Sequence, residues 1–324
     1  MQPMRVISLE DHFWTADIAR AIGALRNPDA VSGTPLEADL ADLGERRLAA
    51  MDEAGIDLQV ISHTTPGVQH LDPDTAIPLA REANDALARA VAEHPDRFAG
   101  FATLPTSAPE AAADELERAV GELGFRGAMV NGHTGGRFLD DPQFDVLLAR
   151  AERLGTPLYL HPAEPVPAVR DAYYTGFDPA VSWFLSAAAF GWHAETGLHV
   201  LRMVLAGVFD RHPQLQLVIG HMGEMLPFML ARVDDNLPPA VTGLDRLPSE
   251  YILANVHITT SGLFTLPPLL CALMVFGADR VLFSVDWPYA PNTDGRRLLE
   301  IAPLSPDDLE RIAHGNAERL LGLT

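Results

Sequence analysis

Lysine is missing from this 324-residue sequence, in which all 23 basic residues are arginine. Its absence excludes a Schiff-base lysine, the lysine of a phosphate-binding loop and a carbamylated lysine that bridges two metal ions. Positive charge is scarce overall, because 44 acidic residues give a net charge of −21 at pH 7. Such an acidic chain is repelled by nucleic acid and by anionic membranes, so neither is expected as a partner.

Cysteine is almost absent, and long apolar segments are absent as well. The single cysteine, Cys271, lies in an apolar run without a partner for an internal disulfide, so a buried, unreactive thiol is expected. No uninterrupted apolar stretch reaches the ~20 residues that a membrane span requires. Residues 1–13 lack the basic and apolar segments of a signal peptide. These features predict a cytoplasmic protein.

Short, largely apolar runs alternate with longer stretches of helical periodicity, as in parallel sheets that are buried on both faces. The expected strands are 5–12, 58–63, 98–104, 127–132, 157–161, 215–221, 256–261 and 280–286. Helices are expected over 44–55, 74–94, 107–124, 141–155, 190–210, 224–236, 267–276 and 305–322. A capping box at 107–110 and a serine cap at Ser305 are expected to begin two of these helices.

Strands that alternate with helices in this way predict an α/β fold, a (β/α)8 barrel of parallel strands spanning residues 1–324 as a single domain. An open doubly wound sheet is the alternative, but the first strand ends in Glu10-Asp11-His12 instead of the glycine-rich turn of that fold. Two connections, 14–43 and 162–184, are longer than a barrel requires. Both follow strand carboxyl ends, so they are expected to form walls of a substrate pocket.

Polar side chains gather at the carboxyl ends of the predicted strands. Glu10 and His12 alternate along the first strand and therefore share a face. Two histidines and an aspartate end later strands, at His161, His221 and Asp286. A lone buried histidine is usually a hydrogen-bonded core residue. Several at equivalent strand ends of a barrel instead predict a metal site with mixed imidazole and carboxylate ligands.

The motifs around these residues resemble the amidohydrolase superfamily and, within it, the amidohydrolase-related decarboxylases, such as those of γ-resorcylate (2,6-dihydroxybenzoate) and 5-carboxyvanillate. The motifs are Leu9-Glu10-Asp11-His12-Phe13, Leu160-His161-Pro162, Gly220-His221-Met222-Gly223-Glu224, 257–262 and 283–288. The resemblance extends from the first strand to the last helix and is weakest in the two long connections.

The resemblance implies a ligand set and catalytic roles. Glu10, His12, His161 and Asp286 would hold one divalent metal ion, with zinc expected and manganese as the alternative. Asp286 would also protonate the ring carbon that loses CO2. His221 and Glu224, expected one helical turn apart, would orient Asp286 or the substrate.

The resemblance also implies a hydroxylated benzoate-type aromatic carboxylic acid as the small-molecule substrate. Arg232, His63 and Asn131 are expected to contact it, with Arg232 binding its carboxylate or phenolate. A surface role for Arg232 and a hydrogen bond within the barrel wall for His63 are the alternatives. Members of the family often form dimers or tetramers, so a homodimer or homotetramer is expected, with the apolar segment 184–192 at its interface.

Hydrolysis of an amide, a lactone or a similar bond at one metal ion is the alternative activity. Hydrolytic relatives with two metals use His-x-His on the first strand and a lysine carbamate on the fourth. The sequence has Glu10-Asp11-His12 and no lysine, which excludes the lysine-bridged site but leaves a one-metal hydrolase open. A metal-stabilised binding protein without catalysis is a third alternative, disfavoured because a closed structural site needs fewer polar strand ends.

Overall fold

Nine parallel strand segments form the centre of the protein in a computed structural model that describes residues 4–23 and 34–323. They are β1 (Ile7–Phe13), β2 (Leu58–His63), β3 (Phe98–Gly100), β4 (Ala102–Thr103), β5 (Ala128–Asn131), β6 (Leu158–His161), β7 (Leu217–Ile219), β8 (Val256–Thr259) and β9 (Val281–Leu282). Each pairs with its neighbour in chain order, β1 to β3 in one sheet and β4 to β9 in another.

The two sheets are parts of one ring, because short links bridge both interruptions. β3 and β4 lie within one predicted strand, and between them the backbone N–H of Phe101 donates to the carbonyl of Ile61 on β2 at 2.9 Å. At the other interruption Asp11 and Trp287 form a parallel bridge, and the N–H of His12 donates to the Trp287 carbonyl at 2.6 Å. The nine segments therefore occupy eight positions around a barrel, as predicted.

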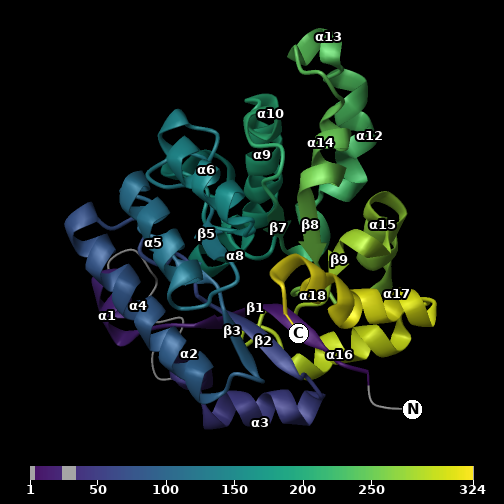
Figure 1. The fold of residues 1–324 in the computed structure, drawn as a ribbon. Coiled ribbons are helices and arrows are strands. Elements are labelled where there is room, and N and C mark those ends of the chain that lie inside the picture. Colours follow the sequence, from purple (N-terminus) through teal and green to yellow (C-terminus); the bar gives the residue numbers. More distant parts are fainter. Residues whose placement is uncertain (1–3, 24–33, 324) are drawn as a thin grey trace.

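Helices surround the strands (Figure 1). Those between consecutive strands are α3 (Glu45–Ala54), α4 (Pro73–Glu93), α5 (Pro109–Gly121), α6 (Asp145–Leu154), α9 (Gly191–Leu205), α10 (Val208–Arg211), α12 (Leu226–Asn236), α14 (Pro248–Asn255) and α15 (Leu266–Phe276). The chain ends with α16 (Asn292–Ile301), α17 (Pro306–Glu310) and α18 (Asn316–Leu321). None of the described helices is both long and apolar enough to cross a membrane.

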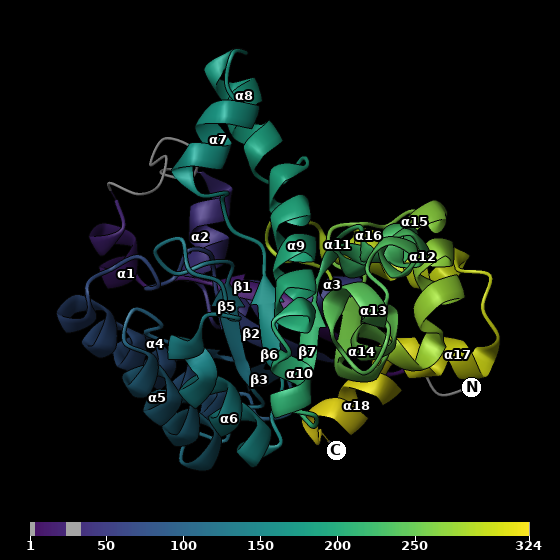
Figure 2. The same ribbon diagram turned by 90° about the horizontal axis from the view of Figure 1, so that it is seen from above.

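The two long connections carry short helices of their own. The first contains α1 (Ala16–Ala21) and α2 (Pro35–Ala41), and its residues 24–33 lie outside the described residues. The second contains α7 (Pro167–Tyr173) and α8 (Pro179–Ser186), which project beyond α9 in Figure 2. Two further short segments, α11 (His221–Glu224) and α13 (Pro239–Thr242), flank α12.

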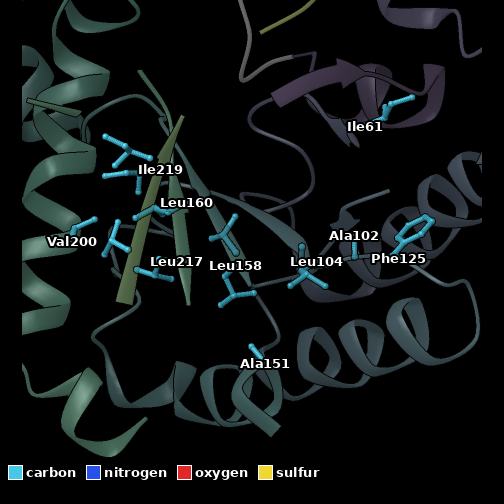
Figure 3. Close-up of a cluster of buried hydrophobic side chains, with 14 of the residues drawn as sticks. Ile61, Ala102, Leu104, Phe125, Ala151, Leu158, Leu160, Val200, Leu217 and Ile219 are labelled. Carbon is cyan, nitrogen blue, oxygen red and sulfur yellow. The ribbon is translucent and has the colours of Figure 1, made fainter. Parts of the chain in front are cut away.

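Side-chain alternation along the strands divides the core into two layers. Leu158 and Leu160 of β6 and Leu217 and Ile219 of β7 pack outward against helices, for example near Val200 of α9 (Figure 3). The residues between them point into the barrel and form a second cluster with Ile7 and Leu9 of β1. Both faces of each strand are therefore buried, which explains why the strands are recognisable as apolar runs.

Several predicted element ends are wrong, each for a local reason. The expected capping box fails because α5 has Ala108 at its N-cap and the Ser107 hydroxyl makes no hydrogen bond to a described residue. The predicted helix 190–210 is interrupted between α9 and α10, where Gly207 adopts a left-handed φ of 68°. The predicted cap at Ser305 is confirmed, since its hydroxyl accepts from the Asp308 N–H at 3.1 Å.

Candidate metal centre

Four side chains from three strand ends meet at the barrel mouth: Glu10 and His12 of β1, His161 of β6, and Asp286 after β9. Each offers one ligand atom, and these atoms lie within 4.8 Å of one another. His12 Nε2 is 3.1 Å from Asp286 Oδ1, and His161 Nε2 is 3.2 Å from Glu10 Oε1. The structure thus brings together the four residues that the sequence motifs implied as metal ligands.

The hydrogen bonding of this cluster is incomplete. Glu10 Oε1, His12 Nε2 and Asp286 Oδ1 are buried and have no hydrogen-bond partner among the described residues. Unpartnered buried polar atoms are costly and rare in folded proteins, so three that face one point require an explanation. A divalent ion would satisfy all of them, and two imidazoles with two carboxylates form a suitable donor set.

Hydrogen bonds on the far side of each imidazole orient the cluster. The Nδ1–H of His161 donates to the Pro162 carbonyl at 2.7 Å, which leaves the Nε2 lone pair facing the cluster. His12 Nδ1 is 3.2 Å from the hydroxyl of Ser62 on the neighbouring strand β2. Outer hydrogen bonds of this kind fix the ring orientation of ligating histidines.

The second oxygen of Glu10, Oε2, accepts hydrogen bonds from Tyr159, which the sequence did not single out, and from Ser261 of the motif 257–262. The hydroxyls of Tyr159 and Ser261 donate to it in short hydrogen bonds, and the Thr259 hydroxyl lies 3.5 Å away. Gly220 permits this arrangement, because a Cβ there would lie 2.7 Å from the same oxygen. A signal was available, since Tyr159 lies two residues before His161 and shares its side of the strand.

A register shift in β1 brings Glu10 to this position. The pairing with β2 is irregular between Ser8 and Asp11. As a result Leu9 lies in the inner core cluster while Glu10, the next residue, also reaches the inner-facing Tyr159. A bulge changes the direction in which side chains point. The regular alternation of side chains between the two faces, which the sequence predicts, therefore holds for only part of this strand.

Burial and charge set the protonation of Glu10 and His12. Burial raises the pKa of Glu10, but the charges of His221, His161 and His12 outweigh it and hold that pKa well below its usual range. Burial lowers the pKa of His12, which favours the neutral imidazole. An ionised carboxylate and a neutral imidazole are the forms that bind metal ions.

Asp286 has an uncommon backbone conformation. Its φ is 77°, in the left-handed region that residues other than glycine seldom adopt. The chain holds it there through the Ala290 N–H, which donates to the Asp286 carbonyl at 3.0 Å, and through the Asp11–Trp287 bridge that follows. Strained residues of this kind concentrate at functional sites, where the surrounding structure fixes them.

A second polar cluster, His193, His221 and Glu224, lies directly beside the ligands. His221 Nδ1 donates to Glu224 Oε1 at 2.8 Å, and His193 Nδ1 lies 2.6 Å from Glu224 Oε2. The three residues also lie close enough to hold a metal ion, but these hydrogen bonds already satisfy the atoms involved. His221 Nε2 is 3.9 Å from both Glu10 Oε1 and Asp286 Oδ2, so this hydrogen-bonded chain ends at the ligand cluster.

The predicted helix over 224–236 begins later than expected. α12 starts at Leu226, and His221, Met222, Glu224 and Met225 all have positive φ values between 50° and 67°. His221 and Glu224 therefore face one another across a left-handed turn, not across one turn of an α-helix. Glycine at 223 is the only sequence signal for this turn, because the other residues are held there by tertiary contacts.

A cavity of about 370 Å³ opens beside the two clusters. Its polar end is formed by His161, His221 and Asp286, while Trp183, Trp192 and Tyr289 provide aromatic walls. Trp183 comes from the second long connection and Trp192 from the start of α9, so the predicted contribution of that connection to the pocket wall is confirmed. The volume suits a ligand with a single aromatic ring.

The three residues expected to contact substrate do not line this cavity. Arg232 lies on the exposed side of α12. His63 is buried in the barrel wall, where its Nε2 accepts from the Thr15 N–H at 3.3 Å and its Nδ1 donates to the Thr64 carbonyl at 2.9 Å. Asn131 is buried at the end of β5 beside Gln69. Their roles towards substrate stay predictions.

Comparison with known proteins places the chain among relatives along its whole length. The amidohydrolase family profile matches residues 12–323. The γ-resorcylate decarboxylase of Rhodococcus jostii (strain RHA1) is 39% identical, with 98% of each chain aligned. A dihydroxybenzoic acid decarboxylase from Polaromonas sp. JS666, with bound manganese and the inhibitor 2-nitroresorcinol, is 36% identical with a TM-score of 0.89 over 99% and 98% of the two chains. The 5-carboxyvanillate decarboxylase of Sphingomonas paucimobilis is 33% identical with a TM-score of 0.90 over 99% and 100%.

Proposed function

The chain belongs to the amidohydrolase family, and we propose that it is a metal-dependent decarboxylase that removes CO2 from a hydroxylated benzoate-type acid. The observation that carries the proposal is a set of three atoms, on Glu10, His12 and Asp286, that have no hydrogen-bond partner within residues 4–23 and 34–323. They lie at the polar end of an aromatic cavity. An aromatic acid placed in this cavity has its carboxylate towards the ligands and its ring between indole and phenol side chains.

Glu10, His12, His161 and Asp286 would hold a single divalent ion. Such an ion would supply a positive charge that favours binding of an acid at this end of the cavity and that stabilises negative charge during the reaction. Zinc is the ion expected from the sequence, and the related Polaromonas structure contains manganese. Imidazole and carboxylate ligands accept either ion, so elemental analysis has to identify the one in use.

Asp286 is the proposed proton donor. When the bond between the ring and the carboxylate breaks, its electron pair stays on the ring carbon, which then needs a proton. Asp286 faces the cavity, and its Oδ2 is 3.9 Å from His221 Nε2. Burial alone would lower the pKa of His221, but the negative charges of Glu224 and Glu10 raise it well above its usual value. His221 therefore carries a proton at neutral pH and is placed to supply it to Asp286.

The remaining proposals concern the whole chain: one barrel domain, a cytoplasmic location, and self-association as a homodimer or homotetramer. Support for self-association comes from exposed apolar side chains, including Phe184 and Phe190 in the expected interface segment and Phe228 on α12, which is 84% exposed. Exposed apolar groups of this size favour burial against another surface. Sedimentation of the wild type and of Phe228→Glu tests it, because a charge at a buried interface would shift the protein towards monomer.

Metal content and substrate turnover test the proposed activity together. The purified protein is subjected to elemental analysis and then incubated with 2,6-dihydroxybenzoate, 5-carboxyvanillate and unsubstituted benzoate, with CO2 release as the readout. We expect one divalent ion per chain and CO2 release from an ortho-hydroxylated acid but not from benzoate, the matched control. Bound metal together with turnover of amides or lactones and no CO2 release would instead favour a hydrolase.

A further inference from the structure

His193 links two parts of the site that the proposed function uses separately. It lies near the start of α9, and its side chain is 17% exposed. Its Nδ1 is 2.6 Å from Glu224 Oε2, within the hydrogen-bonded chain that leads through His221 to Asp286. Its Nε2 is 2.9 Å from the carbonyl of Ala188, a residue of the cavity wall between α8 and α9.

Both partners of His193 accept hydrogen bonds. Ala188 offers a carbonyl, and Glu224 offers a carboxylate oxygen. Burial raises the pKa of Glu224, but His221 and His193 lower it by more than burial raises it. The pKa therefore lies below its usual value, and the carboxylate is ionised. Each ring nitrogen of His193 therefore faces an acceptor, and the side chain is placed to donate one hydrogen bond in each direction.

The surrounding backbone is built to bring α9 onto Glu224. Gly197 lies one helical turn after His193, and a Cβ there would be 2.6 Å from the Glu224 carbonyl oxygen, so only glycine permits this approach. Glu224 itself belongs to the left-handed turn 221–225, a conformation that is unfavourable for residues other than glycine. The His193–Glu224 bond is a tertiary contact that helps to hold this turn.

We propose that His193 is a positioning residue with two separable roles in the proposed decarboxylation. Through Nδ1 it orients Glu224, and thereby His221, towards Asp286. Through Nε2 it fixes the Ala188 turn and with it the adjoining cavity wall, which includes Trp183 and Trp192. The first role acts on the chemical step and the second on substrate binding, so the two are expected to affect kcat and KM differently.

Two substitutions separate the roles. The amide nitrogen of asparagine occupies nearly the position of histidine Nδ1, so His193→Asn keeps the donor to Glu224 and loses the donor to Ala188. The amide nitrogen of glutamine reaches nearly the position of Nε2, so His193→Gln keeps the donor to Ala188 and loses the donor to Glu224. His199→Gln is the matched control, because His199 lies on the same helix but bonds the Leu139 N–H at 2.7 Å, away from the cavity.

For His193→Gln we expect kcat to fall about 10- to 100-fold with little change in KM, the range seen when an outer partner of a catalytic group is removed. For His193→Asn we expect KM to rise roughly three- to tenfold, as for the loss of one neutral hydrogen bond, with kcat nearly unchanged. Thermal melts accompany the kinetics. If both variants change kcat and KM alike and in proportion to lost stability, as in the control, the role is merely structural and the proposal is wrong.

Two readouts do not depend on turnover. Nitrogen-15 NMR of histidine-labelled wild-type protein should show a hydrogen bond at each His193 ring nitrogen, and a ring nitrogen without a hydrogen bond would overturn the proposal. Quenching of tryptophan fluorescence by 2-nitroresorcinol should show weaker binding for His193→Asn than for His193→Gln, and the reverse order would overturn it as well. A wild type that releases no CO2 but gives the expected NMR signals refutes the proposed activity and leaves the two-donor geometry intact.

Discussion

Two clusters of imidazoles and carboxylates lie side by side at the barrel mouth, and they differ in how their atoms are partnered. In the Glu10–His12–His161–Asp286 cluster, three buried atoms lack a hydrogen bond to any residue that the structure describes. In the His193–Glu224–His221 cluster, the ring nitrogens and carboxylate oxygens that face one another are already hydrogen-bonded. Proximity alone would make either cluster a metal site. The unsatisfied atoms indicate that the Glu10–His12–His161–Asp286 cluster is the metal site. The second cluster is fully hydrogen-bonded, which suits a role in orienting the residues of the first.

The largest effect is expected from Asp286→Asn, which removes the proposed proton donor and one ligand. Turnover should fall by about a thousandfold or more, within the range for loss of a general acid, while the barrel stays folded. The measurement is CO2 release under single-turnover conditions. Asp294→Asn on the exposed side of α16 is the control and should behave as wild type. An Asp286→Asn protein that folds and keeps substantial turnover would exclude the proton-donor role.

Metal content separates the two clusters directly. His161→Ala deletes a buried proposed ligand, so the purified variant should retain far less than one ion per chain, and its thermal midpoint should no longer respond to a chelator. His193→Ala removes the hydrogen bonds to Glu224 and Ala188 but none of the four proposed ligands, so it should keep its ion. The wild-type midpoint should fall on chelation. Loss of the ion from both variants would mean that the second cluster also coordinates metal.

The fold and part of the site could be predicted from the sequence, but the contacts that distinguish the two clusters could not. All eight strand positions were predictable, because strands buried on both faces are continuous apolar runs. The proximity of Glu10, His12, His161 and Asp286 followed from motifs at equivalent strand ends. Neither the bulge in β1 nor the left-handed turn 221–225 was predictable, since both depend on contacts between distant segments. His193 was recognisable as a histidine near the long connection, but its partners were not.

Hydrogen bonds to Glu10 offer a smaller test of the first cluster. Tyr159→Phe removes one hydroxyl donor from Glu10 Oε2 and leaves Ser261 in place. Metal affinity should fall about tenfold, as expected for loss of an outer partner. The control is Tyr251→Phe, which removes a hydroxyl that donates to Asp210 Oδ1 at 2.7 Å among the outer helices. It should lose some stability and keep its metal affinity, as measured by competition with a chelator. Equal losses of affinity would show that Tyr159 acts only through the fold.

The smallest effect concerns a histidine that belongs to neither cluster. His199 is buried on α9, its Nε2 accepts from the Leu139 N–H at 2.7 Å, and burial lowers its pKa from 6.5 to about 3. Below pH 6.5 His199 therefore becomes protonated in the unfolded chain, whereas in the folded chain it stays neutral down to about pH 3. The difference in protonation of His199 does not affect the free energy of unfolding well above pH 6.5. As the pH falls below 6.5, it lowers this free energy by up to about 1.4 kcal/mol per pH unit.

His199→Gln isolates this contribution, because the glutamine oxygen is an acceptor that does not titrate in this range. Between pH 6.5 and pH 5 the wild type should lose about 1.6 kcal/mol more of its free energy of unfolding than the variant does. Urea denaturation of both proteins at the two pH values gives the difference, and groups common to both cancel. Identical losses would mean that His199 is protonated in the folded protein, which its acceptor bond to Leu139 does not allow. Because His199 is on the same helix as His193, the same variant also measures how far damage to α9 alone reaches the site.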